Sequence, residues 1–222
     1  MLIPIKIKYL SSLILKKNLS FKNITSNDPY EFNKNIQNIR FGNTFKTSGF
    51  NRLNLTYDFI INLRNNYSNV ADIGSSDGSS SLKLIDNLKF KKFFFLDKYH
   101  ECRLSIDSKN FYLLDNKNNL HMLETDKLII YFDPLKENKN LFNLIIDKHF
   151  KKVSFTNTQN ISFLNPIYKI HKKRDKIFYK KFDFFDNIKN NLTYDLIFMS
   201  NILNKFHSKA SNIKMIKNKI NS

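Results

Sequence analysis

The chain has 222 residues, of which 41% are hydrophobic, and a formal net charge of +18 at pH 7. This length can bury a core, and we expect one domain with an N-terminal extension. The single cysteine excludes an internal disulfide and a cysteine-rich zinc site, and no apolar run reaches the roughly 18 residues of a membrane-spanning helix, so we predict a cytoplasmic protein without a transmembrane segment.

The positive charge has two interpretations. A strongly basic chain often binds nucleic acid or another anionic surface. However, Asn, Lys, Ile and Phe, which A/T-rich codons favour, dominate the composition, and the basic residues are spread along the chain in short clusters such as Lys91-Lys92 and Lys172-Lys173-Arg174. A nucleic-acid partner therefore stays an alternative and is not the leading prediction.

Residues 1–66 are expected to form a mainly helical N-terminal extension. Lysines interrupt the apolar run of residues 1–17, so we expect a packing strand or an amphipathic helix there, with peripheral membrane contact as the minor alternative. Asp28-Pro29 is typical of a helix start, residues 41–51 form a turn-rich connector, and the apolar spacing over 53–63 predicts a helix.

The hydrophobic period then changes. The run Val70-Ala71-Asp72-Ile73 predicts a buried parallel strand, SSSLKLIDNL (79–88) predicts a helix with a serine N-cap, and KKFFFLD (91–97) predicts a second buried strand. Strand, tight turn, helix and strand make a βαβ unit.

The chain beyond this unit contains further segments of both kinds. We expect a hairpin-type insert near 111–132 around Asp115–Asn119. The other expected elements are strands at 128–134, 176–186 and 194–203, helices at 141–150 and from 208 onwards, and an apolar stretch at 161–166 that ends in Asn-Pro.

The turn between the first two buried strands carries the most specific signal. A glycine-rich turn lets a ligand approach the backbone closely. The dinucleotide pattern G-x-G-x-x-G keeps one of its three glycines here, and the Gly-Lys-Ser/Thr of a phosphate-binding loop is missing. The sequence Asp72-x-Gly74-x-Ser76-x-Gly78 instead resembles the first motif of class I S-adenosylmethionine-dependent methyltransferases.

Three later segments are similar to further motifs of this superfamily, in the expected order. Asp97 matches the acid that holds both ribose hydroxyls, Asp183 and Phe184 match the pair beside the adenine, and Ser200 and Asn201 match the polar residues that face the transferable methyl group. The resemblance extends over about residues 50–207, and it is nearest to bacterial members of unassigned substrate.

The resemblance implies an α/β, Rossmann-like methyltransferase fold over residues 67–222, with a central, mostly parallel sheet and helices on both faces. The family sheet has seven strands, and the fourth is reached at 194–200, so the last strands at the C-terminus lack sequence. Three explanations are open: a shortened gene product, which we favour, completion of the sheet by insert strands 111–132, or a partner that covers the exposed edge.

We therefore predict an S-adenosylmethionine-dependent methyltransferase with S-adenosylmethionine as cofactor, an unknown methyl acceptor and no metal. The sequence after the fourth strand lacks the Pro-Pro tetrad of amino-methylating nucleic-acid enzymes, and Cys102 is not placed as a nucleophile for base-carbon methylation. The alternatives are a basic nucleic-acid-binding protein or RNA methyltransferase, and a non-catalytic relative with the same fold. No catalytic residue is assigned, since packing is the stronger expectation for Tyr194 and His207.

Overall fold

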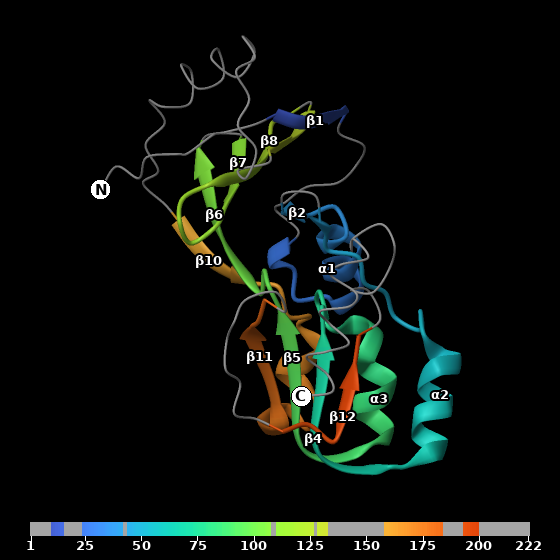
Figure 1. The fold of residues 1–222 in the computed structure, drawn as a ribbon. Coiled ribbons are helices and arrows are strands. Elements are labelled where there is room, and N and C mark those ends of the chain that lie inside the picture. Colours follow the sequence, from blue (N-terminus) through green and yellow to red (C-terminus); the bar gives the residue numbers. More distant parts are fainter. Residues whose placement is uncertain are drawn as a thin grey trace, which may run out of the picture. The chain divides into compact units, whose positions relative to one another are not determined.

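A computed structural model describes residues 10–15, 24–41, 44–107, 110–126, 128–132, 158–183 and 193–199. The chain divides into two compact units, each assembled from separate stretches. The first unit comprises Met1–Thr47 and Glu101–Phe163, and the second comprises Ser48–His100 and Leu164–Ser222 (Figure 1). Predicted elements over 141–150 and from 208 onwards lie outside the described residues.

The first unit contains a six-stranded antiparallel sheet. Its strands follow the order β1-β9-β8-β7-β6-β10. They are β1 (Leu10–Leu15), β6 (Glu101–Asp107), β7 (Asn110–Leu114), β8 (Leu120–Glu124), β9 (Leu128–Phe132) and β10 (Thr158–Ser162). The predicted hairpin is confirmed as β7–β8 and the predicted strand after it as β9. Of the two structures expected near the N-terminus, the strand is the one observed, and it pairs with β9.

Asp115 organises the turn of the β7–β8 hairpin. Its carboxylate accepts hydrogen bonds from the backbone N–H of Lys117 at 2.8 Å and of Asn119 at 2.9 Å, and from the side-chain amide of Asn119 at 2.7 Å. Burial by itself raises the pKa of Asp115, but these bonds and the one from His121 hold it well below its ordinary value. Asn118 adopts the left-handed conformation that such a turn requires.

The segment before β6 adds a helix and a short hairpin to the first unit. Helix α1 (Pro29–Ile36) begins after Asp28, whose carboxylate accepts the N–H of Glu31 at 2.7 Å, so the predicted helix start is confirmed. Strands β2 (Arg40–Phe41) and β3 (Thr44–Phe45) pair around the start of the predicted connector. Phe41 packs edge-on against Phe163, with ring centroids 5.5 Å apart.

The second unit contains a four-stranded parallel sheet in the order β11-β5-β4-β12. Its strands are β4 (Asn66–Ile73), β5 (Lys89–Asp97), β11 (Ile177–Lys181) and β12 (Leu196–Phe198), so the strands predicted at 70–73, 91–97, 176–186 and 194–203 are confirmed, although only β4 and β5 are mostly buried. From β4 the chain adds β5 and then β11 on one side, whereas β12 lies on the other side of β4. The order of strands therefore reverses between β4 and β12, and Figure 1 shows all four arrows pointing the same way.

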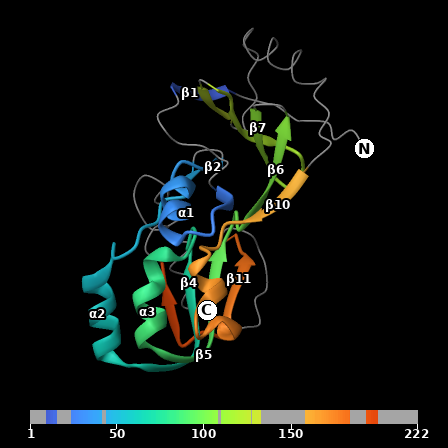
Figure 2. The ribbon, with the colours of Figure 1, turned by 180° about the vertical axis from the view of Figure 1, so that it is seen from behind.

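The described helices of this unit pack on one face of the sheet. They are α2 (Asn54–Leu63), α3 (Leu82–Asn87) and α5 (Ile167–Ile170), with 3-10 turns η2 (Ser79–Ser81) and η3 (Arg174–Lys176) (Figures 1 and 2). Tyr57 of α2 and Tyr168 of α5 join Phe93 and Phe95 in one apolar cluster, while Phe94 and Leu96 belong to a cluster on the opposite face. Helices on both faces stay a prediction, because no described helix packs on the second cluster.

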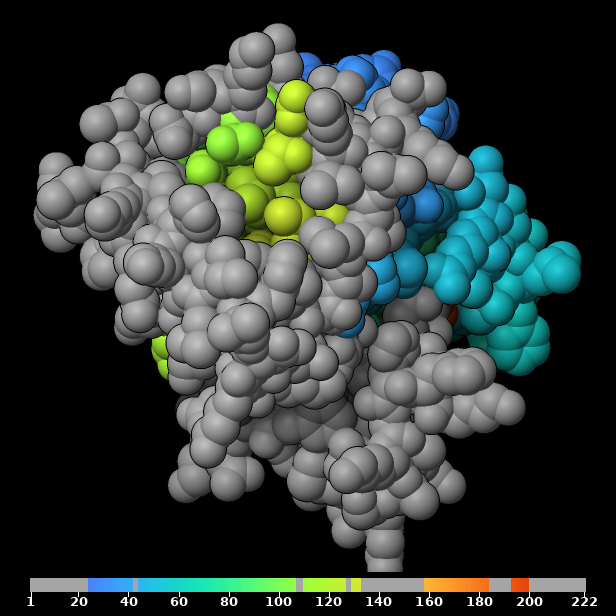
Figure 3. Space-filling model, turned by 90° about the horizontal axis from the view of Figure 1, so that it is seen from above, coloured from blue at the N-terminus to red at the C-terminus, as the bar shows by residue number. Residues whose placement is uncertain are grey.

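Helix α2 carries its apolar residues on two sides. Ile60 and Ile61 pack against the core, but Leu55, Phe59 and Leu63 are exposed, and the helix contributes to the cyan surface in Figure 3. No helix in the described part of the chain is long and apolar enough to cross a membrane.

The expectation that insert strands 111–132 complete the parallel sheet is wrong. The strands of the 111–132 insert pair within the antiparallel sheet of the first unit, so they do not complete the parallel sheet. Within the described residues β12 pairs with β4 alone and is an edge strand.

Candidate functional site

The structure brings most of the predicted site residues to one edge of the parallel sheet. Asp72 and Gly74 lie at the end of β4, Asp97 is the last residue of β5, and Asp183 follows β11. Ser76 and Gly78 are in the turn after β4, while Phe184, Ser200, Asn201 and His207 lie outside the described residues. This is the carboxyl edge, and it includes the point where the strand order reverses, the usual place for ligands in open α/β sheets.

The turn after β4 has an unusual backbone. Gly74, Ser76 and Gly78 have φ angles of 74°, 58° and 79°, so every second residue is left-handed. The Gly74 N–H donates to the Leu96 carbonyl of β5 at 2.7 Å, and the Gly78 N–H donates to the Ser75 carbonyl at 2.9 Å. Glycine has no steric penalty in this conformation, and a serine there costs free energy that the surroundings must offset.

Gly78 is required by the protein's own core. A Cβ atom at this position would lie 2.8 Å from Cζ of Phe95. The Phe95 ring has little room to move because it packs against Phe93 and Tyr168, with centroids 5.1 and 5.0 Å away. The Tyr168 hydroxyl also donates to the Gly78 carbonyl at 2.7 Å. The sequence-based interpretation attributed the glycine to ligand approach, whereas here ring packing by itself accounts for it.

Asp97 already holds the turn. One of its carboxylate oxygens accepts the Ser76 N–H and the other accepts the Tyr99 N–H, both at 2.9 Å. Each carboxylate oxygen has two acceptor sites. The two backbone bonds by themselves do not use all of these acceptor sites.

Asp72 is a buried acid that is only half satisfied. Its Oδ2 accepts the Ser81 hydroxyl at 2.6 Å, but its Oδ1 is buried and has no hydrogen-bond partner. Burial raises the pKa of Asp72 to about 7; the Ser81 hydrogen bond opposes this, and the nearby charges of Asp97 and Asp77 reinforce it. The predicted serine N-cap is wrong in its detail, since Ser81 precedes α3 but its hydroxyl is bonded to Asp72 and not to the helix backbone.

Two serines beside Asp72 are likewise unsatisfied. The hydroxyl oxygens of Ser75 and Ser76 are buried without a hydrogen-bond partner. Buried polar atoms in proteins are nearly always bonded to protein, water or ligand. Three oxygens in and before one turn therefore have hydrogen-bonding capacity left for water or for a ligand.

Asp77 is a site residue that the sequence analysis did not identify. It is fully buried, accepts the Ser79 N–H at 3.0 Å and the Asn165 side-chain amide at 3.1 Å, and its carbonyl accepts the Asn165 N–H at 2.9 Å. Asn165 comes from the stretch ISFLNP, so the Asn-Pro signal marks the segment that braces the turn. Tyr179 of β11 adds a bond from its hydroxyl to the Ser76 carbonyl at 2.6 Å.

Asp183 lies against the end of the neighbouring strand. Its carboxylate accepts a charge-assisted bond from Lys98 Nζ at 2.7 Å, and Lys98 directly follows Asp97. Asp183 is buried, and the adjacent Phe182 N–H donates to the Asp97 carbonyl at 3.0 Å. The predicted ribose-side and adenine-side acids are thus neighbours.

Tyr194 serves packing, as the sequence analysis favoured, and Asp195 joins two neighbouring strands. Asp195 accepts the backbone N–H groups of Ser68 and Asn69, which fixes the start of β12 to β4. Tyr194 packs edge-on against Phe94, with ring centroids 5.6 Å apart.

Cys102 is buried in β6 of the first unit, and burial raises the pKa of its thiol well above the ordinary value. Among the described residues no group of three His, Cys, Asp or Glu side chains is placed to hold a metal ion. Comparison with known proteins found no family model, curated protein or solved structure that matches this chain.

Proposed function

We propose that the second unit binds S-adenosylmethionine at the carboxyl edge of its parallel sheet and that the protein is a methyltransferase with an unassigned acceptor. The observation that carries this proposal is the turn after β4, which lies where the strand order reverses. Three of its residues are left-handed, and the N–H of the middle one, Ser76, donates to the Asp97 carboxylate. The order β11-β5-β4-β12 also supports it, because it matches strands 3-2-1-4 of the class I fold that the sequence resembles.

Asp97 is the residue best placed to bind the ribose. A carboxylate at the end of the strand next to a glycine-rich turn accepts two sugar hydroxyls in nucleotide-binding α/β folds. The two backbone bonds orient the Asp97 carboxylate before a ligand arrives, so little further ordering is needed on binding.

The charges at the turn favour this ligand over a dinucleotide. Asp72, Asp77 and Asp97 interact electrostatically, so a pyrophosphate placed at the turn would meet three acids. S-adenosylmethionine has no phosphate and carries an ammonium and a sulfonium. Because Asp72 is almost completely buried, we expect its charge to act on the ammonium through space or through a water molecule.

The cofactor supplies an electrophilic methyl group whose bond to sulfur breaks as the acceptor's bond to carbon forms, and the acceptor releases its proton. The protein's contribution is to orient both partners in line. Asp97 would fix the ribose, Asp183 would lie beside the adenine, and the turn residues would define the sulfonium end. Phe184, Ser200 and Asn201 keep the roles that the resemblance implies, as predictions.

Calorimetric titration with S-adenosylhomocysteine tests the proposal. The wild type should bind it and should not bind NAD⁺ under the same conditions. Asp97→Ala should weaken binding by about 1.5–3 kcal/mol, the range for hydrogen bonds to a charged group. Asp175→Ala is the matched control, since Asp175 is an exposed acid of the same unit whose nearest ion pair, to Arg174, spans 3.6 Å. No heat of binding from wild-type protein with a folded circular-dichroism spectrum would refute the proposal.

Binding and turnover need separate measurements. A methyltransferase should produce S-adenosylhomocysteine from S-adenosylmethionine when an extract of candidate acceptors is added. Binding with no product on any acceptor panel would instead support the non-catalytic alternative.

A further inference from the structure

Both edges of the parallel sheet in the second unit carry charged residues. The carboxyl edge carries Asp72, Asp77, Asp97 and Asp183. The amino edge carries a group of exposed cations, which we call the amino-edge patch and which consists of Lys89, Lys91, Lys92, Lys172, Arg174 and Lys176. The carboxyl edge also carries the exposed Lys98 and Lys181, but there they lie among the four acids.

Strand pairing and side-chain contacts bring the patch together. Lys89, Lys91 and Lys92 lie in the first half of β5, and Lys176 directly precedes β11, whose Ile177 is in register with Phe93. Lys173 Nζ lies 5.3 Å from the centroid of the Phe90 ring, which places the neighbouring Lys172 and Arg174 beside the same strand.

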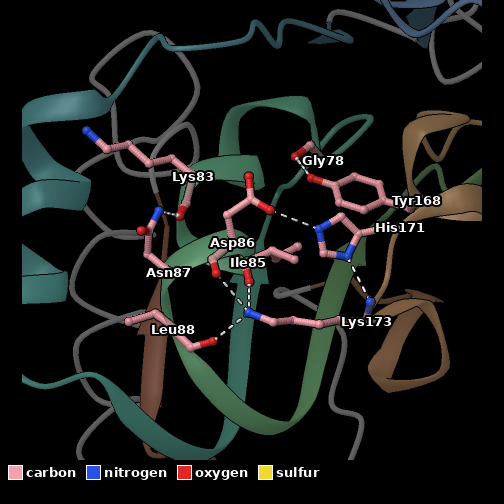
Figure 4. Close-up of polar contacts among 9 residues, drawn as sticks. All are labelled: Gly78, Lys83, Ile85, Asp86, Asn87, Leu88, Tyr168, His171 and Lys173. Atoms are coloured by element: carbon pink, nitrogen blue, oxygen red, sulfur yellow. Dashed lines mark hydrogen bonds and ion pairs between the residues drawn. The ribbon is translucent and has the colours of Figure 1, made fainter.

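The segment that carries half of the patch is firmly anchored. Lys173 Nζ donates to the carbonyls of Asp86 and Leu88 at 3.0 and 2.9 Å and to that of Ile85, at the C-terminal end of α3 (Figure 4). His171 Nε2 lies 3.0 Å from Asp86, and the Lys173 N–H donates to His171 Nδ1 at 3.1 Å. The Lys173 ammonium group therefore makes structural hydrogen bonds. The backbone of its neighbours Lys172 and Arg174 is held in place, and their side chains are exposed.

Three acids lie near the six cations of the patch: Asp175, Asp86, which is 3.0 Å from His171, and Asp195, which accepts the N–H of Asn69 on the strand beside Lys92. Asp175 is the one acid on its described segments, and its contact with Arg174 is 3.6 Å long with both side chains mostly exposed, so it is weak. Lys91 and Asp97 are six residues apart on β5, which is roughly 20 Å in a strand. That exceeds the Debye length of about 8–10 Å at physiological salt, so the acids of the carboxyl edge do not neutralise the patch.

We propose that the amino-edge patch binds the phosphodiester backbone of a nucleic acid. Exposed cations on one strand and on the anchored turn beside it suit a polyanion, and phosphate contacts of this kind need no base recognition. A membrane surface fits less well, because stable attachment combines basic residues with an apolar face or a lipid anchor, and Ile170 is the one strongly exposed large apolar residue on residues 89–92 and 169–176.

The two proposed sites are independent. Nucleic acid on the amino edge leaves the carboxyl edge open, so the patch would serve to localise the protein and would not present the base to the cofactor. Asp97→Ala should consequently leave nucleic-acid affinity unchanged, and loss of the patch should leave binding of S-adenosylhomocysteine unchanged.

Fluorescence anisotropy with a labelled single-stranded RNA and a labelled DNA duplex, over a range of salt concentrations, tests the patch. The variant Lys91→Gln/Lys92→Gln/Lys176→Gln should lose at least about tenfold in affinity, and its salt slope should fall by roughly 2 to 3. The control variant Lys34→Gln/Lys117→Gln/Lys181→Gln removes the same charge from exposed positions outside the patch and should lose less than about twofold. The RNA and duplex arms show which nucleic acid binds more tightly.

Three outcomes would overturn the inference: equal losses in both triple variants, which would indicate attraction by net charge alone; no binding of either nucleic acid by folded wild type; or patch-dependent binding to vesicles of anionic phospholipid without binding to nucleic acid.

Discussion

Replacing Asp72 with Asn should stabilise the protein, and more so as the pH rises. Asp72 has its pKa raised by burial from an ordinary 3.8 to about 7. A carboxyl with a raised pKa in the folded state binds its proton more tightly there than in the unfolded chain. Ionisation therefore favours unfolding, and the free energy of unfolding falls as the pH rises from about 4 to about 7.

The magnitude follows from the two pKa values. The full difference of roughly three pH units corresponds to about 4 kcal/mol. Between pH 5 and pH 8 the free energy of unfolding should fall by about 2–3 kcal/mol of this total. The remainder is already lost below pH 5, where the carboxyl of the unfolded chain ionises. Asn is isosteric and does not titrate, so it removes this loss.

Urea unfolding of wild type and Asp72→Asn at both pH values measures the effect. The variant also loses its own contacts, for instance if the new amide finds no acceptor, but that cost is nearly the same at pH 5 and pH 8. We therefore compare the difference in unfolding free energy between variant and wild type at pH 5 with the same difference at pH 8. Asp58→Asn, at an exposed ion pair with Lys83, is the control and should show a change below about 0.5 kcal/mol. An equal difference at pH 5 and pH 8 for Asp72→Asn would refute the reasoning.

Three further predictions concern unfolding by urea or heat. Gly78→Ala should lower the free energy of unfolding by about 2–4 kcal/mol, because the added Cβ clashes with Phe95 and the left-handed backbone is strained for alanine. Gly49→Ala, with no atom within 4 Å of the added Cβ, should lower it by less than about 1 kcal/mol, and equal losses would contradict the role of Phe95 packing. Lys173→Met should lower the free energy of unfolding by about 1–3 kcal/mol, because the hydrogen bonds to the carbonyls at the end of α3 are lost. Lys172→Met, at an exposed position, should lower it by about 0.5 kcal/mol or less, and similar values for the two variants would contradict the anchoring role of Lys173. Asp115→Ala should lower the free energy of unfolding by about 1–3 kcal/mol at pH 7, and this loss should shrink as the pH falls below about 4, because the pKa of Asp115 is held below its ordinary value. A loss no larger than that of the control Asp126→Ala, or a loss that does not change with pH, would contradict the proposed role of the turn hydrogen bonds.

The parallel sheet could be predicted from the sequence because its signals are local. VADI and FFFLD are continuous apolar runs between turn residues, which is typical of strands buried on both faces. The spacing around the first turn also predicted which residues gather at the carboxyl edge, since parallel strands end on the same side.

The antiparallel sheet could be predicted only in part. The β7–β8 hairpin has a local turn signal, but β1 pairs with β9 and β10 with β6 across long stretches of chain. Such pairings depend on contacts that no sequence window contains. The same limit applies to Asp77 and Asn165, which are 88 positions apart and joined by side-chain bonds.

Packing and hydrogen bonds within the protein explain some of the residues at the turn after β4, but not all of them. Packing against Phe95 accounts for Gly78, and the bonds to Asn165 account for Asp77. Folding does not account for Asp72, whose raised pKa opposes stability at neutral pH and whose Oδ1 has no partner, nor for the unsatisfied hydroxyls of Ser75 and Ser76. Sites that destabilise a fold are typical of function, because a ligand supplies what the chain lacks. If Asp72→Asn both stabilises the protein and weakens binding of S-adenosylhomocysteine, which keeps the ammonium group, the buried carboxylate is present for a cationic ligand and not for the fold.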